Sequence, residues 1–229
     1  MRVVILQPSY LPWLGYFDQL YKSDIFVLYD DVQFDKHGWR NRNRIKTPQG
    51  PQWLTVPALT RGLGKPTNRD VRITPKDPWR RKHLQALRTY YAKASAFADV
   101  FPRIEDWLSK DWEFLWELNL AGLRMFCDML GLKREIRLSS ALNIGGGQTE
   151  RLVGICQALG ATSYLSGDAA RSYVDAELFA EAGVRLAFHG YHHPTYTQMY
   201  GDFVSHLSII DLLMNHGTRS LQILVDDST

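Results

Sequence analysis

The sequence predicts an α/β protein with a Rossmann-like parallel sheet core, an inserted hairpin-like segment and a helical middle region. Three observations support this fold class. Two short, β-branched apolar runs near the N-terminus flank an amphipathic stretch, which is typical of a strand-helix-strand unit. Three segments with apolar residues at helical spacing occupy the middle of the chain. After them, strand and helix patterns alternate again, as in α/β proteins.

The first strand-helix-strand unit consists of residues 2–6, 15–22 and 25–29. Continuous apolar strands on both sides of a crossover helix indicate a parallel sheet that is buried on both faces. Residues at the carboxyl ends of such strands line the ligand crevice. We therefore expect Gln7 and Asp30, which follow the two strands, at the same edge of the sheet.

The inserted segment is rich in cations, proline and glycine. Residues 39–46 and 52–57 have β character and enclose a Pro/Gly cluster, which predicts a hairpin-like turn. The glycine and proline content of residues 61–69 predicts an irregular, mobile loop.

The remaining elements follow from apolar spacing and from helix-ending glycines. Gly131 and Gly217 stand where C-caps belong. A helical subregion is expected at about 79–131. The expected helices are 79–91, 97–108, 112–130, 148–159, 176–182 and 207–216, and the further strands are 134–138, 163–166 and 184–188. Residues 226–229 are expected to form a frayed tail.

The composition fits one folded domain over residues 1–229. Apolar residues make up 45% of the chain and aromatic residues 12%, which excludes a disordered protein. The formal net charge of +3, from 27 Lys and Arg against 24 Asp and Glu, is too small to favour a nucleic-acid partner.

The cysteines and the apolar runs indicate a cytoplasmic protein. Cys127 and Cys156 lie in apolar helical segments, which predicts buried free thiols in a reducing compartment. The first apolar run stops at Gln7 and Pro8, so the pattern lacks the core of a secretion signal. No apolar stretch approaches the roughly 20 residues that span a bilayer, and we expect no membrane insertion.

A proline-rich loop after the first strand is the first candidate site. Gly15 would let a ligand approach the start of the following helix, where an anion can bind, and Gln7 and Tyr10 flank that position. The placement resembles the loop of nucleotidylyltransferases and pantothenate-synthetase-like ligases, which suggests ATP, although their two loop histidines are missing here. The alternative is a rigid loop that packs aromatic side chains.

Two consecutive carboxylates, Asp30 and Asp31, follow the second strand. Carboxylates at this edge suit three roles: orienting a ribose, holding Mg²⁺, or acting as a general base. The alternative is a turn or a cap. Because consecutive residues at a strand end point in opposite directions, we expect the two to differ in role.

Cations alternate with two asparagines and an isoleucine between positions 40 and 46. In an extended segment all four cations would share one face, which suits a phosphate, whereas a solvated edge strand is the alternative. The phosphate-binding candidates in this segment are Arg40, Asn41, Arg42, Arg44 and Lys46.

Two later segments add candidates. Ser166 and Gly167 follow a predicted strand, where small residues let a ligand reach backbone amides, and Arg171 supplies a counter-charge. The alternative is an ordinary β-α turn. One of His189, His192 and His193, with His192 as the first choice, is a candidate acid or base, and the alternative is a structural hydrogen bond. No Cys/His spacing indicates a metal site.

The chain resembles the WbqC-like protein family over nearly its whole length. The resemblance rests on five stretches: QPSYLPWLGYFD (7–18), YDDVQF (29–34), RNRNRIK (40–46), YLSG (164–167) and LSIIDLL (207–213). It implies a bacterial or archaeal cytoplasmic protein whose relatives are often encoded among surface-polysaccharide genes, such as those for O-antigen.

Two functional hypotheses follow. The first is an enzyme that modifies a nucleotide-linked amino sugar, by transfer of an acyl or aminoacyl group to form an amide, as a transferase or an ATP-dependent ligase. The second is a non-catalytic protein that binds a nucleotide sugar or a glycan-assembly partner. In the C-terminal helix we expect Asp211 to hold a polar partner and to serve stability rather than chemistry.

Overall fold

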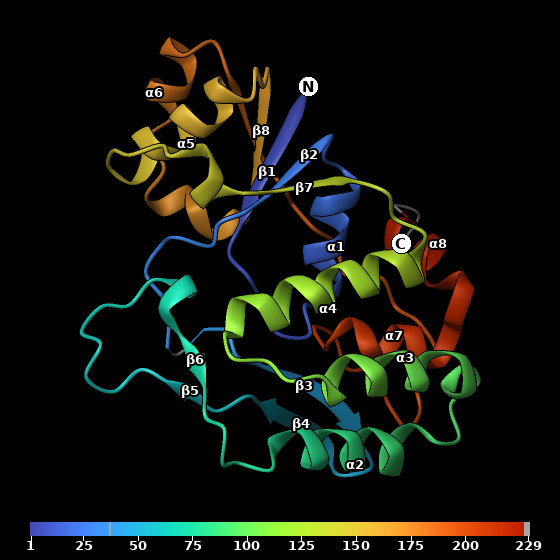
Figure 1. The fold of residues 1–229 in the computed structure, drawn as a ribbon. Helices are drawn as coiled ribbons and strands as arrows, with labels where there is room; N and C mark the ends of the chain where they lie inside the picture. Colours follow the sequence, from blue (N-terminus) through green and yellow to red (C-terminus); the bar gives the residue numbers. More distant parts are fainter. Residues whose placement is uncertain (37, 227–229) are drawn as a thin grey trace. The chain divides into compact units, whose positions relative to one another are not determined.

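The computed structural model describes residues 1–36 and 38–226, which form two compact units (Figure 1). Unit 1 comprises Met1–Gln7, Asp18–Val32 and Arg134–Tyr191, and unit 2 comprises Pro8–Phe17, Gln33–Lys133 and the residues from His192 onward. The chain passes between the units five times, so neither unit is one continuous stretch. The expectation of a single domain over residues 1–229 stays a prediction.

The core of unit 1 is a five-stranded parallel sheet in the order β7-β2-β1-β8-β9. Its strands are β1 (Arg2–Leu6), β2 (Ile25–Leu28), β7 (Glu135–Leu138), β8 (Ser163–Ser166) and β9 (Arg185–Phe188). In chain order this is a 3-2-1-4-5 arrangement, in which the direction of winding reverses beside β1. The predicted Rossmann-like parallel core is confirmed.

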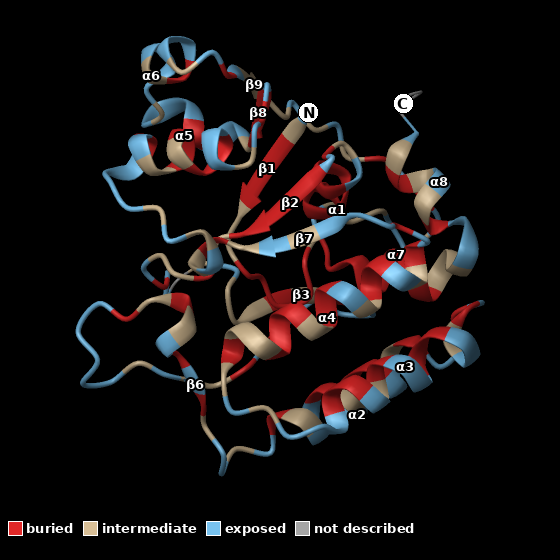
Figure 2. Ribbon diagram, turned by 45° about the horizontal axis from the view of Figure 1, so that its top comes forward, coloured by how far each residue is buried: buried red, intermediate tan, exposed pale blue. Residues whose placement is uncertain are grey.

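The first two predicted strands, β1 and β2, are largely buried. Figure 2 shows β1 and β2 buried over most of their length, whereas β7 at the sheet edge is half exposed. In register, Val4 of β1 lies opposite Phe26 of β2, and both side chains are inaccessible to solvent. Burying β-branched and aromatic residues on both faces is what stabilises a parallel sheet in water.

Helices complete unit 1. They are α5 (Gln148–Ala158) and α6 (Ala176–Glu181), together with the 3-10 turns η2 (Ser139–Leu142) and η3 (Asp168–Ser172), and α1 (Leu14–Tyr21) begins in unit 2 and ends in unit 1. One apolar cluster joins β1 and β2 to α5 and α6 through Val3, Val27, Ile155 and Phe179. Cys156 lies in the same cluster as a free thiol, and burial raises its pKa to about 12.

Unit 2 contains the inserted hairpin. The strands β3 (Arg42–Thr47) and β4 (Gly50–Thr55) pair in antiparallel register, and Gly50 has the positive φ of 104° that the turn requires. A second pair, β5 (Ala58–Leu59) with β6 (Arg72–Ile73), was not expected. The predicted irregular segment 61–69 also needs correction, because the 3-10 turn η1 (Asn68–Asp70) begins inside it.

The helices of unit 2 are α2 (Trp79–Tyr91), α3 (Phe97–Ser109), α4 (Leu115–Leu130), α7 (Ile209–His216) and α8 (Ser220–Val225), with the turn η4 (Gly217–Arg219) between the last two. The helix predicted at 112–130 is α4, which begins three residues later than predicted, at Leu115. Its expected first turn is extended instead, because Glu113 accepts a backbone hydrogen bond from Ile73 and Leu115 donates one to Val71. Pairing with β6 thus competes successfully with helix formation.

Both cysteines are buried and free in the structure. Cys127 is a buried free thiol like Cys156, as predicted. Among the residues that the structure describes, no helix combines the length and the apolar character needed to cross a bilayer. The expected frayed tail, apart from Asp226, lies outside the described residues.

Candidate functional site

The carboxyl edge of the parallel sheet in unit 1 is the place where this strand order predicts a ligand. The crevice of a doubly wound sheet lies outside the carboxyl ends of its strands, at the reversal of winding. Here the reversal lies between β1 and β8, which end at Leu6 and Ser166. Gln7, half-buried, and Gly167 follow these two strands directly.

Asp30 is fully buried at this edge and is held by the turn that follows β7. Its carboxylate accepts hydrogen bonds from the Ser139 hydroxyl at 2.9 Å, the Ser140 amide at 3.0 Å and the Ser140 hydroxyl at 2.8 Å. A buried carboxylate with several donors is stabilised in place and is shielded from a substrate. Asp30 therefore acts as a positioning residue that fixes η2 against the end of β2.

Asp31 points to a different environment, as the alternation at a strand end requires. One carboxylate oxygen lies 2.5 Å from the Ser139 hydroxyl, and the other pairs with the Arg151 guanidinium from α5. The Asp31 side chain keeps 23% of its exposure and that of Arg151 keeps 17%. Unlike Asp30, this pair presents a negative and a positive group to solvent side by side.

Aromatic side chains surround the Asp31–Arg151 pair. The Arg151 guanidinium lies 5.0 Å from the centre of the Tyr29 ring. Burial raises the pKa of Tyr29, an effect that the nearby Arg151 charge opposes. Tyr173 is half-exposed and lies close enough to Tyr29 to raise its pKa slightly further. A carboxylate, a guanidinium and phenol rings suit a polar ring-shaped ligand such as a sugar.

The candidates after β8 take part in local contacts. Ser166 is buried and hydrogen-bonds the Tyr164 phenol. Arg171 pairs with Asp168 at 3.1 Å and lies over the Phe188 ring at 4.1 Å, while more than half of its side chain is exposed. Ligand binding by Ser166, Gly167 and Arg171 stays a prediction.

His189, one of the predicted acid or base candidates, pairs at the end of β9 with Asp18, a partner that sequence reasoning missed. His189 Nε2 lies 2.5 Å from an Asp18 carboxylate oxygen, and both side chains are 98% buried, with 2% exposed. The same oxygen lies 2.8 Å from the Lys22 ammonium, and the Tyr191 ring stacks on the imidazole. The contact with Asp18 through Nε2 fixes the orientation of the imidazole ring.

A signal for His189 was present in the sequence, because it follows a predicted strand directly. The adjacent candidate, His192, belongs to unit 2 and is exposed, and its role as an acid or base stays a prediction.

In unit 2, the cationic segment is only partly open. Arg42 and Arg44 lie on β3 with their guanidinium groups 4.7 Å and 5.7 Å from the Trp53 ring. Lys46 is 98% buried, with 2% exposed, and its ammonium donates to the Asp202 carbonyl at 2.5 Å. The loop after Gln198 covers Lys46, and phosphate binding by this segment stays a prediction.

The neighbouring candidates Arg40 and Asn41 help to close the hairpin. The Asn119 amide donates to the Arg40 carbonyl, and Asn41 donates to the Val56 carbonyl, each at 2.8 Å. Burial lowers the pKa of the Arg40 guanidinium. A direct contact of Arg40 or Asn41 with phosphate stays a prediction.

The proline loop packs as its alternative interpretation proposed. Tyr10 is fully buried, and its hydroxyl lies 2.8 Å from His83 Nδ1, so it has no exposed surface for a ligand. A Cβ atom at Gly15 would lie 2.3 Å from the Trp13 ring. Gly15 therefore leaves room for an indole, and a ligand such as ATP at this helix start stays a prediction.

The donor set does not fit Mg²⁺. Among the described residues, no group of three or more His, Cys, Asp and Glu side chains could hold a metal ion. Asp30 is saturated by serine donors, and the Arg151 cation stands where Asp31 would bind a metal.

The strand order and the polar groups at the carboxyl edge define a Rossmann-like α/β protein. Its sequence places it more narrowly. The chain belongs to the WbqC-like protein family, whose sequence pattern matches residues 7–223. It is 40% identical over 225 residues to "Uncharacterized protein Rv1507c" of Mycobacterium tuberculosis (strain ATCC 25618 / H37Rv). The aligned residues cover 96% of this chain and 95% of the relative. No solved structure matches significantly.

Proposed function

We propose that the protein is a cytoplasmic enzyme of surface-polysaccharide biosynthesis, such as that of O-antigen, which modifies a nucleotide-linked amino sugar. The observation that carries the proposal is the Asp31–Arg151 pair, which is partly exposed at the carboxyl edge of a Rossmann-like sheet. Membership of the WbqC-like protein family supports the polysaccharide setting. Nucleotide sugars are cytoplasmic metabolites, which gives the proposed compartment.

The proposed reaction is the transfer of an acyl or aminoacyl group to the sugar amine. The amine nitrogen forms a bond to the acyl carbon, the bond from that carbon to the donor's leaving group breaks, and the leaving group keeps the electron pair. Asp31 orients the amine and accepts the proton that the nitrogen loses. Arg151 offers a forked donor to a phosphate or to the developing oxyanion. Arg42 and Arg44 stay our phosphate-binding candidates in unit 2.

A second candidate function is binding without turnover. It is favoured by the contacts of Asp31, whose two oxygens already face the Ser139 hydroxyl and the Arg151 guanidinium. A carboxylate with such partners recognises hydroxyl and amino groups more readily than it accepts a proton. In this case the same edge would hold a nucleotide sugar for a partner enzyme.

Substitution of the two neighbouring carboxylates tests the site. Asp31→Asn should reduce the affinity for a UDP-linked amino sugar at least tenfold in calorimetry, because a charged hydrogen bond is lost, and should leave the melting temperature nearly unchanged. Asp30→Asn is the matched control. It should lower the free energy of unfolding by about 2 kcal/mol, because buried serine donors lose a charged acceptor. Normal binding by Asp31→Asn would refute the site.

Mass spectrometry separates the two functions. The protein would be incubated with the UDP-linked amino sugar and an acyl thioester, and the mass of the sugar would be followed. An increase equal to the acyl group supports the enzyme, whereas tight binding with no change of mass supports the binding protein. Absence of both binding and turnover for nucleotide sugars would refute both.

A further inference from the structure

A long segment of unit 2 contains basic residues but no acidic ones. Residues 36–69 contain eight Lys and Arg and no Asp or Glu, so the rest of the chain, with 19 cations and 24 acids, has a formal charge of −5. Lys46 is enclosed, but Lys36, Arg61 and Lys65 are exposed. A protein with a small net charge thus concentrates a strong positive potential in one segment.

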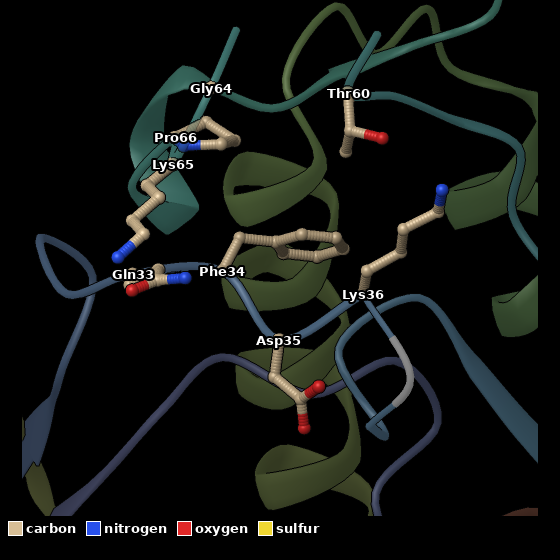
Figure 3. Close-up of a pocket in the computed structure, with 8 residues that line it drawn as sticks. All are labelled: Gln33, Phe34, Asp35, Lys36, Thr60, Gly64, Lys65 and Pro66. Carbon is tan, nitrogen blue, oxygen red and sulfur yellow. The ribbon is translucent and has the colours of Figure 1, made fainter.

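A pocket forms where the two ends of this segment meet. The Phe34 amide donates to the Pro66 carbonyl at 2.8 Å, which joins residues 33–36 to residues 60–66. Between them lies a cavity of about 580 Å³, lined by Gln33, Phe34, Asp35, Lys36, Thr60, Gly64, Lys65 and Pro66. Figure 3 shows Lys65 and Lys36 on opposite sides of the Phe34 ring, and the Asp35 carboxylate directed away from it. The lining therefore suits an anion.

Apolar side chains are exposed beside these cations. Leu63 is 48% exposed between Gly62 and Gly64, whose φ angles of 83° and 63° shape the turn of the loop. Leu59, on the edge strand β5, is 43% exposed. The tip of the loop thus reads Arg-Gly-Leu-Gly-Lys, an apolar residue with a cation on each side. Burial of such leucines needs an apolar phase, which a soluble anion does not offer.

Two exposed indoles belong to the same segment, Trp53 on β4 and Trp39 before β3. Trp39 is 39% exposed and Trp53 is 44% exposed, and their ring centres lie 5.3 Å apart. Arg44 lies near both rings. Of the seven large apolar residues that are exposed in the described chain, these two tryptophans and the two leucines fall within residues 36–69. Indoles beside cations are typical of surfaces that contact the interfacial region of a bilayer.

We propose that residues 36–69 dock the protein on an anionic phospholipid membrane. Lys36 and Lys65, on opposite sides of the Phe34 ring, each bind a lipid headgroup phosphate at the edge of the pocket, and Leu63 enters the boundary of the acyl chains. Arg61 adds long-range attraction to the lipid surface. This is association with one face of a bilayer and requires no spanning segment. A nucleic acid would use the cations but would leave Leu59 and Leu63 in water, so the membrane accounts for more of the surface.

Vesicle sedimentation tests the proposal with the full chain. Vesicles of phosphatidylcholine with 30% phosphatidylglycerol should carry the protein into the pellet at low salt, and vesicles of pure phosphatidylcholine should not. The Debye length, over which charges attract each other, shortens to about 3 Å in 1 M salt. The fraction of protein bound to the vesicles should therefore fall sharply at that salt concentration. Equal sedimentation with both vesicle types would refute the electrostatic component.

Variants identify the residues responsible. The triple variant Lys36→Ala, Arg61→Ala, Lys65→Ala should bind anionic vesicles about 100-fold more weakly, at about fivefold for each cation. A matched triple variant replaces Arg81, Lys82 and Lys93, exposed cations of unit 2 outside the segment, and should bind like the parent. Equal losses in both triple variants would refute the assignment to residues 36–69.

Leu63 gives a second and independent test. Leu63→Ser keeps every charge and should weaken vesicle binding about tenfold by removing apolar contact. Tyr21→Ser, which changes an exposed aromatic residue outside the segment, is the control. Normal binding by Leu63→Ser, or tighter binding of the parent to single-stranded RNA or to glycerol phosphate than to anionic vesicles, would overturn the membrane assignment. Circular dichroism confirms that each variant is folded.

Discussion

Acid should destabilise unit 2 through His83. This histidine on α2 is 95% buried, with 5% exposed, and its Nδ1 accepts a hydrogen bond from the Tyr10 hydroxyl at 2.8 Å. The ring donates a second hydrogen bond to the Thr55 backbone carbonyl, which partly opposes the effect of burial. Burial lowers the pKa of His83 to about 4, against 6.5 for a free imidazole. A proton on Nδ1 would remove the acceptor that Tyr10 requires.

The pKa values determine the sign and the size of the effect. Between pH 6.5 and about 4 the unfolded state binds the proton and the folded state does not, so stability is complete above pH 6.5 and is lost as the pH falls. At pH 5 the solution is about 1.5 pH units below the pKa of His83 in the unfolded state, which is 6.5, and it is still above the pKa in the folded state. At 1.36 kcal/mol for each unit, His83 should cost the folded state about 2 kcal/mol at pH 5.

Urea denaturation at pH 7 and at pH 5 measures this loss. All seven tryptophans belong to unit 2, so intrinsic fluorescence reports the unfolding of the unit that contains His83. His83→Asn is the control, because the amide keeps a polar atom near Tyr10 and does not titrate. The parent should lose about 2 kcal/mol more than the variant between the two pH values. Equal losses would refute the assignment of this titration to His83.

Two further substitutions test the packing of unit 2. Gly122→Ala would place a Cβ atom 2.5 Å from the buried Trp107 ring, and should lower the free energy of unfolding by about 1–3 kcal/mol in urea; parental stability would show that the ring moves freely. Asp211, fully buried, accepts hydrogen bonds from Tyr91 at 2.7 Å and from Tyr196 at 3.0 Å. Asp211→Asn should therefore cost about 1–3 kcal/mol in the same assay, and lost activity at an unchanged melting temperature would make Asp211 catalytic instead.

The fold was predictable where a single element buries a repeated pattern. Apolar spacing located α2 at Trp79–Tyr91, with both ends correct. It did not reveal β5 and β6, which have two residues each and exist because Ala58 lies opposite Ile73. It also placed the start of α4 too early. In these places the backbone conformation depends on pairing with a segment that is distant in sequence. Local propensity carries no information about such a partner.

The same limit applies to the candidate site. Alternation at a strand end correctly separated Asp30 from Asp31, since one is buried and the other is partly exposed. The partner Arg151 lies 120 residues from Asp31, and nothing in its own surroundings marks it. His189 and Asp18 are 171 residues apart. The sequence marks polar residues at strand ends, but tertiary structure chooses their partners.

The central position of β1 has a consequence for protein synthesis. Arg2 and Val3 pair with Ser163 and Tyr164 of β8, and the N-terminal ammonium donates to the Thr162 hydroxyl at 2.8 Å. At 5–20 residues per second, a ribosome needs about 10–30 s between making these two strands. During that time one edge of an apolar strand waits without its partner and can pair with another chain. We expect nascent chains that stall before residue 163 to need a chaperone, because the sheet cannot close until the last third of the protein has emerged.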